Sequence, residues 1–147
     1  MTLLNKKQIE ALIPHREPIL MVDSVEKIDQ ESGHIIAHKH LKEDDGCLEG
    51  HFPGHPIMPG VLMIEAMAQA SAVFVTHTLG RKSENTLFYF MTIEKAKFRK
   101  PVMPTCTLEF DVKLIKQKRD IYIFSGTTSV DGTVCVEAEF MAKILER

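Results

Sequence analysis

The sequence predicts an α+β domain in which an antiparallel sheet wraps around one long central helix. Residues 61–79 are apolar on nearly every side, so we expect them to form a helix at the centre of a domain. Residues 87–145 contain strand-like segments joined by short turns, which is typical of antiparallel hairpins. The chain of 147 residues suits a single domain, residues 1–147, with one substantial core.

The composition is that of an ordinary soluble protein, with 44% hydrophobic and 26% charged residues. A formal net charge of -2 gives no general argument for nucleic-acid binding. The 3 cysteines form no C-x-x-C pair, which indicates reduced intracellular thiols rather than a disulfide framework or zinc finger. The first residues lack the order of a signal peptide, and polar residues interrupt the apolar helix. We therefore expect a cytoplasmic protein without a membrane span.

The N-terminal part of the chain predicts one short helix and two strands. Residues 5–12 have helical periodicity, and Asn5 is a suitable N-cap. Residues 19–28 predict a strand, although their alternation of apolar and polar side chains is imperfect. Residues 33–41 alternate more clearly and predict a second strand. The charged residues 42–45 then indicate an exposed loop.

The C-terminal part predicts four consecutive antiparallel strands. Residues 117–120 and the pair Asp131-Gly132 have the composition of hairpin turns. The expected strands lie at residues 87–100, 106–116, 121–130 and 133–145. Local hairpins together with one buried helix lead to the α+β prediction.

A stiff loop containing two histidines runs directly into the central helix. It reads Gly50-His51-Phe52-Pro53-Gly54-His55-Pro56-Ile57-Met58-Pro59-Gly60. Three prolines and three glycines in this stretch disfavour regular structure. Glu65 and Gln69 follow on one face of the helix, one turn apart. A carboxylate near the start of a buried helix, just after a histidine loop, suggests a catalytic site.

The same loop, followed by Glu65-Ala66-Met67-Ala68-Gln69, closely resembles the 3-hydroxyacyl-[acyl-carrier-protein] dehydratases of the FabZ type. The similarity extends in collinear order to Ile13-Pro14-His15-Arg16, Val22-Asp23, Ala96-Lys97-Phe98-Arg99-Lys100-Pro101-Val102 and Val130-Asp131-Gly132. The resemblance implies the hot-dog fold, with a homodimer as the smallest active unit, often assembled into a hexamer. It also implies dehydration of (3R)-3-hydroxyacyl-[acyl-carrier-protein] to the trans-2-enoyl thioester in type II fatty acid biosynthesis, without a cofactor.

This reaction needs a base for the C2 proton, an acid for the departing hydroxyl and donors that polarise the thioester oxygen. His51 suits the base, because an imidazole changes its protonation near neutral pH. Glu65 suits the acid if apolar surroundings raise its pKa. The backbone N–H groups of Gly60 and Val61 suit the third task, because they lie at the positive end of the helix dipole. The resemblance assigns His51 and Glu65 as the catalytic pair and the Gly60 N–H as oxyanion donor, and it implies that His51 and Glu65 meet across the dimer interface.

Other residues are candidates for supporting roles. Gln69 either orients Glu65 or satisfies a buried backbone group. Met58, Tyr89 and Phe90 are candidates for the wall of an acyl tunnel, with Tyr89 as the candidate gate, although most such residues are plain core. We expect no metal at the His51-x-x-x-His55 spacing, because the loop is broken by prolines and has no evident third ligand.

Lys95, Lys97 and Arg99 occupy alternate positions of a predicted strand and are expected to share one face. A solvated surface is one interpretation. The functional interpretation is a basic rim that attracts an acidic acyl carrier protein carrying the substrate on a phosphopantetheine arm.

Three other functions remain as alternatives. The first is a bifunctional dehydratase that also isomerises trans-2 to cis-3 enoyl thioesters, but the better-known family of this kind has Asp where this chain has Glu65. The second is a hot-dog acyl thioesterase, and the third is a non-catalytic module that binds the acyl carrier protein. His51 together with Glu65 argues against both of these. The acyl chain length and the choice between dimer and hexamer stay open.

Overall fold

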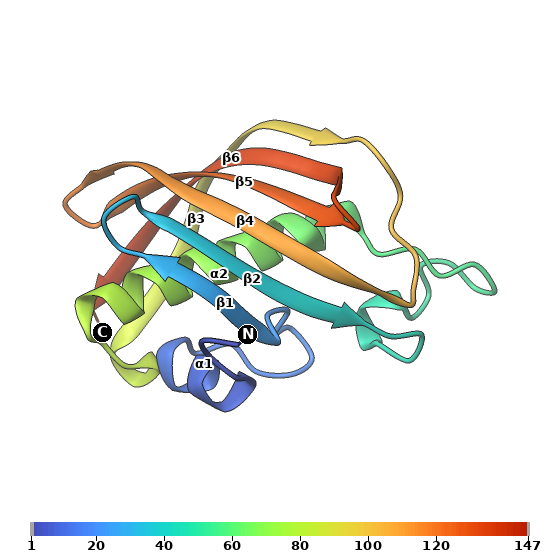
Figure 1. Ribbon diagram of the computed structural model, residues 1–147, viewed down its shortest axis with the longest axis horizontal. Helices are drawn as coiled ribbons and strands as arrows, with labels where there is room; N and C mark the ends of the chain where they lie inside the picture. Colours follow the sequence, from blue (N-terminus) through green and yellow to red (C-terminus); the bar gives the residue numbers. More distant parts are fainter. Residues whose placement is uncertain (1, 147) are drawn as a thin grey trace.

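The computed structural model describes residues 2–146, in which six strands form one antiparallel sheet wrapped around a long helix (Figure 1). The order of strands across the sheet is β1-β2-β4-β5-β6-β3. The helices are α1 (Lys6–Leu12) and α2 (Gly60–Leu79), with 3-10 turns at Gly46–Leu48 and Ser83–Asn85. The strands are β1 (Ser24–Asp29), β2 (His34–Leu41), β3 (Thr86–Phe98), β4 (Cys106–Lys118), β5 (Ile121–Val130) and β6 (Thr133–Glu146). This architecture confirms the predicted α+β fold class.

Helix α2 is the core element against which the sheet packs. Its most apolar stretch has a mean hydropathy of 1.3, so by length and composition alone the helix could cross a membrane. However, 67% of that stretch is buried inside the protein, as expected for a core helix. Gly126 of β5 allows the sheet to come close, because a Cβ at this position would lie 2.8 Å from the Met67 sulfur.

The N-terminal segment confirms the predicted helix but not the full length of the first predicted strand. The Asn5 side chain accepts the backbone N–H of Gln8 at 2.9 Å, and the Gln8 side chain accepts that of Asn5 at 2.8 Å. This reciprocal capping fixes the start of α1. The strand predicted over residues 19–28 begins only at Ser24. Before it, backbone groups of Ile19 and Met21 bond to a helix side chain instead of a neighbouring strand.

Strands β4, β5 and β6 form the two predicted hairpins. The turn at Asp131-Gly132 has φ values of 49° and 81°, which suit a two-residue hairpin turn. Strand β3 does not pair with β4, its successor in the chain, but with β6 at the far side of the sheet. Pro101 and Pro104 lie in the connection that follows β3, where the strand was expected to end.

Strand β3 forms one edge of the sheet and is exposed over most of its length. Five of its large apolar side chains are 40–55% exposed, and they are Tyr89, Phe90, Met91, Ile93 and Phe98. A long edge strand with apolar side chains and unpaired backbone groups is a template for pairing with another chain.

Candidate active site

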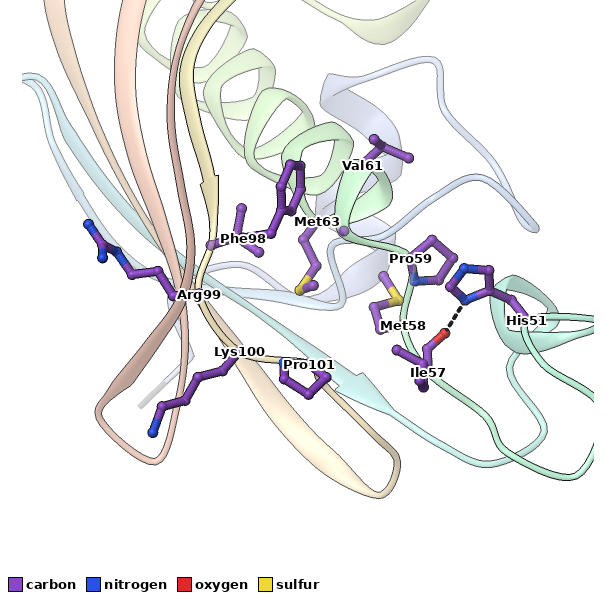
Figure 2. Close-up of a pocket in the computed structure, with 12 residues that line it drawn as sticks. His51, Ile57, Met58, Pro59, Val61, Met63, Phe98, Arg99, Lys100 and Pro101 are labelled. Atoms are coloured by element: carbon purple, nitrogen blue, oxygen red, sulfur yellow. Dashed lines mark hydrogen bonds between the residues drawn. The ribbon is translucent and has the colours of Figure 1, made fainter.

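The His51 side chain is held in place by its own loop (Figure 2). Its Nδ1 lies 2.7 Å from the carbonyl oxygen of Ile57, and the Ile57 N–H donates to the His51 carbonyl at 2.8 Å. Because a carbonyl oxygen can only accept, Nδ1 carries a hydrogen. In the neutral ring Nε2 then has the free lone pair, so the loop prepares His51 to accept a proton at Nε2.

The start of α2 lies in the same pocket as His51. This pocket has a volume of about 510 Å³, and its lining includes His51, Met58, Gly60, Val61 and Phe98. The helix begins at Gly60 after Pro59, and no side chain among residues 2–146 caps its first turn. Backbone N–H groups at such a helix start can bind a developing negative charge. The Phe98 ring packs so closely on Gly60 that a Cβ at this position would collide with it.

Glu65 lies in a second, smaller pocket of about 50 Å³, together with His15, Gln69, Phe88 and Tyr89. Burial raises the pKa of the Glu65 carboxyl, and the hydrogen bond from Gln69 partly opposes this shift. The expectation that apolar surroundings raise the pKa of Glu65 is therefore confirmed in direction. A carboxyl group with a raised pKa keeps its proton closer to neutral pH, as a general acid requires.

Gln69 makes both kinds of contact considered in the sequence analysis. Its Nε2 donates to Glu65 Oε2 at 2.8 Å and to the Ile19 carbonyl at 2.8 Å, and its Oε1 accepts the Met21 N–H at 2.7 Å. The amide thus fixes the Glu65 carboxyl relative to the segment after α1. Because Oε2 accepts the hydrogen bond from Gln69, the proton of a neutral Glu65 is best placed on Oε1.

His15 is a further neighbour of Glu65, and no role was expected for it. Its Nε2 lies 3.8 Å from Glu65 Oε2, and its Nδ1 is buried without a hydrogen-bond partner among residues 2–146. Burial, and secondarily the charge of Arg16, lowers the pKa of His15. The imidazole beside Glu65 is therefore kept neutral near pH 7. No spacing rule connects His15 with Glu65, so only the tertiary fold shows this contact.

His51 and Glu65 do not meet within one chain. Within the described part of the chain, the two pockets share no lining residue. His51 faces the C-terminal end of β3 at Phe98, whereas Glu65 faces the N-terminal part of β3 at Phe88 and Tyr89. The tunnel candidates are divided in the same way, with Met58 in the first pocket and Tyr89 in the second. Phe90 also lines the second pocket.

The predicted regular row of Lys95, Lys97 and Arg99 is interrupted. The pairing of β3 with β6 shifts between Glu94 and Lys97, and Lys95 has a φ of 53°, so a bulge breaks the assumed alternation. Lys95 pairs with Glu139 of β6 at 3.0 Å, and Arg99 bonds to both carboxylate oxygens of Glu137 at 3.1 and 3.0 Å. These β6 carboxylates neutralise part of the predicted basic rim.

Comparison with known proteins identifies the family. Residues 13–139 match the FabA-like domain. A Campylobacter curvus protein named 3-hydroxyacyl-[acyl-carrier-protein] dehydratase FabZ is 40% identical over 144 residues, covering 95% of this chain and 97% of that protein. The chain belongs to the FabZ family. The Aliivibrio fischeri FabZ is 45% identical over 136 residues, which cover 92% of this chain and 90% of that protein.

Solved structures of lower identity share the fold. One is the dehydratase heterocomplex ApeI:P from Xenorhabdus doucetiae, with a TM-score of 0.79 at 20% identity over 92% of this chain and 89% of that one. Another is a hypothetical thioesterase of Streptococcus pneumoniae with coenzyme A. It has a TM-score of 0.61 at 14% identity, and the match covers 84% of this chain and 85% of that one. The hot-dog fold expected from the FabZ resemblance is confirmed, and at these identities the neighbours show the fold alone.

Proposed function

We propose that the protein dehydrates (3R)-3-hydroxyacyl-[acyl-carrier-protein] to trans-2-enoyl-[acyl-carrier-protein] in type II fatty acid biosynthesis. The observation that carries this proposal is the 40–45% identity to FabZ proteins over nearly the whole chain. The environments of His51 and Glu65 support it, because one side chain is prepared to accept a proton and the other to keep one. The three free cysteines fit a reducing cytoplasm, which we propose as its location.

The residues have distinct roles in the proposed reaction. His51 Nε2 removes the C2 proton, and the electron pair of that C–H bond forms the C2–C3 double bond. The C3–O bond breaks while Glu65 Oε1–H protonates the departing hydroxyl, which leaves as water. The N–H groups of Gly60 and Val61 stabilise the negative charge on the thioester oxygen. A proton then passes from His51 back to Glu65, so no co-reactant is consumed.

We further propose that a complete site forms between two copies of the chain. Two copies can pair antiparallel through their β3 edges, where large apolar side chains are exposed. Such pairing places the C-terminal end of one β3 beside the N-terminal part of the other. The His51 pocket of one chain then faces the Glu65 pocket of its partner, since these pockets lie at opposite ends of β3. Homodimers are therefore the smallest active unit, and three of them can form the hexamer considered above.

Product analysis tests the proposed reaction. Purified protein should convert 3-hydroxyacyl-carrier proteins of several chain lengths to trans-2-enoyl thioesters, which mass spectrometry and chromatography distinguish from isomers and free acids. A cis-3 product would favour the bifunctional alternative instead. Release of free fatty acid without dehydration would contradict the proposal and favour a thioesterase.

Carrier-protein docking is proposed for the basic residues near the end of β3. Figure 2 shows the Arg99 and Lys100 side chains extending away from His51 at the border of the pocket. Lys95 and Arg99 are paired with glutamates. Lys97 is therefore the best of the three residues for a test of carrier-protein docking. Lys97→Glu should raise the apparent KM for carrier-protein substrates about threefold at low salt, because rim charges act mainly on encounter rates.

The docking test needs a small substrate and a control lysine. The effect of Lys97→Glu should shrink with added salt and be absent for a small acyl thioester without the carrier protein. Lys116 lies at an exposed position of β4. Lys116→Glu should leave the KM unchanged both for the carrier-protein substrate and for the small acyl thioester. Equal losses on both substrates would show that Lys97 supports the fold or the active site rather than docking.

A further inference from the structure

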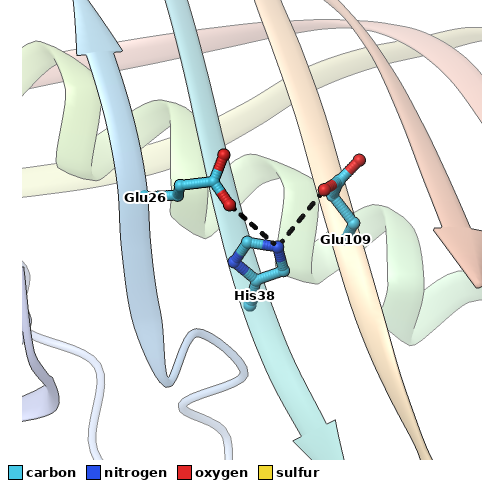
Figure 3. A group of neighbouring side chains, drawn as sticks. All are labelled: Glu26, His38 and Glu109. Carbon is cyan, nitrogen blue, oxygen red and sulfur yellow. Dashed lines mark hydrogen bonds and ion pairs between the residues drawn. The ribbon is translucent and has the colours of Figure 1, made fainter. Parts of the chain in front are cut away.

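A cluster of three potential metal ligands lies on the outer face of the sheet, which is the face that points away from α2 (Figure 3). We call Glu26, His38 and Glu109 the outer-face cluster. His38 Nε2 lies 3.8 Å from Glu26 Oε1 and 3.3 Å from Glu109 Oε1. All three ligand atoms lie within 4.8 Å of one another. None of these residues lines the pockets of His51 or Glu65.

Strand pairing determines how these side chains come together. His38 occupies an outward position of β2, because its neighbours Ala37 and Lys39 are buried. Glu109 of β4 lies directly opposite His38, and such cross-strand partners share one face of a sheet. Glu26 is the extra residue of a bulge in β1, between Val25 and Lys27. Bulges redirect side chains, and this one directs Glu26 toward His38.

A cation between the carboxylates would relieve the repulsion between their charges. The carboxylate oxygens of Glu26 and Glu109 lie within 4.8 Å of each other, so their charges repel. A neutral His38 has one hydrogen at most on Nε2 and cannot satisfy both carboxylates from that atom. A metal ion bound by all three ligand atoms satisfies them together.

The separation of His38 and Glu109 fits a tetrahedral ion of the zinc class. With metal–ligand bonds of about 2.0–2.2 Å, neighbouring ligands of a tetrahedral site lie roughly 3.3–3.6 Å apart. The separation of His38 and Glu109 is 3.3 Å, and that of His38 and Glu26 is 3.8 Å. The Glu26 side chain is 47% exposed, so a small rotation brings it into range. Imidazole favours zinc-like ions over magnesium and calcium, which prefer oxygen ligands.

We propose that Glu26, His38 and Glu109 bind one divalent transition-metal ion such as Zn²⁺, with water as the fourth ligand. The ion joins β1, β2 and β4 across the outer face and takes no part in dehydration. Because the ligands come from three strands, only the folded chain presents the site. Metal binding therefore stabilises the folded state in proportion to the logarithm of metal concentration.

Titration with Zn²⁺ tests the site in tag-free protein that a chelator has stripped of metal. Wild-type protein should bind one equivalent per chain at pH 7.5 and show a higher Tm with Zn²⁺. His38→Ala should weaken this binding by about tenfold or more and lose the rise in Tm, because it removes the only nitrogen ligand. Glu109→Gln should weaken binding as well. Dehydratase turnover of both variants should match that of wild type.

His40→Ala is the matched control, since His40 is the next outward residue of β2 and its ring bonds to the Thr107 hydroxyl instead of a carboxylate. It should bind Zn²⁺ like wild type. Equal Zn²⁺ binding by His38→Ala and wild type would overturn the proposal, because other histidines would then be the ligands. No stoichiometric binding by wild type would also overturn it.

Discussion

His51→Ala should lower kcat by roughly 10³-fold, the scale expected when a positioned general base is removed. The fold should survive, because His51 lies in a loop outside the sheet and the helices. Its ring makes one hydrogen bond, from Nδ1 to the Ile57 carbonyl, and loss of such a bond costs only about 1 kcal/mol. Turnover of 3-hydroxyacyl-carrier protein under saturating substrate is the measurement.

The exposed His55 of the same loop provides the control. His55→Ala should keep nearly full activity, because the loop contacts of His55 are backbone hydrogen bonds to Phe52 that alanine retains. Circular dichroism and sedimentation should show the same fold and assembly for both variants. A folded His51→Ala protein with near-normal dehydration would refute the role of His51 as base.

The parts of the fold that could be predicted are those determined by local sequence. The apolar helix α2 and the hairpin at Asp131-Gly132 follow from residue types in one short stretch. The late start of β1 depends instead on Gln69, which bonds to the backbone carbonyl of Ile19, 50 residues away. Likewise, the pairing of β3 with β6 joins strands that are distant in sequence. Periodicity carries no information about such contacts.

The same distinction applies to the candidate site. The histidine loop and the helix after it are contiguous, so one motif indicated His51, Gly60 and Glu65 together. His51 and Glu65 lie in different pockets, each lined by a different part of β3. The spacing of residues in the sequence does not show this arrangement. His15 was missed for a similar reason, because it reaches Glu65 only through tertiary packing.

Glu65→Gln should lower kcat by about 10²–10³-fold, because glutamine has no carboxylic proton to give the departing hydroxyl. The substitution keeps the size of the side chain and an oxygen that can accept the hydrogen bond from Gln69. In wild type, kcat should fall as pH rises through the raised pKa of Glu65, since the acid must be protonated. This alkaline fall should be absent from the residual activity of Glu65→Gln.

Stability provides a control for Glu65→Gln. A carboxyl group whose pKa is raised by folding binds more protons in the folded state than in the unfolded state. Its contribution to stability is therefore highest at low pH and decreases as pH rises from the unfolded pKa through the folded pKa. Glutamine has no such penalty, so the Tm of Glu65→Gln at pH 8 should equal or exceed that of wild type. A markedly lower Tm would mean that loss of activity reflects damage to the core.

Mixing the two inactive variants tests whether a site is shared between chains. A heterodimer of His51→Ala and Glu65→Gln protomers has one site with both His51 and Glu65 and one site with neither. Random exchange makes about half of all dimers heterodimers, so the mixture should recover about a quarter of wild-type activity.

Wild type mixed equally with the double variant His51→Ala/Glu65→Gln gives the complementary measurement. Shared sites leave only wild-type homodimers fully functional, and activity should fall to about a quarter of that of an all-wild-type sample. Sites within single chains would leave half of the activity, and they would give no recovery when the single variants are mixed. Native mass spectrometry of the mixtures confirms that exchange has occurred. Exchange without recovery would therefore refute the shared site and the β3 pairing that brings His51 of one chain to Glu65 of the other.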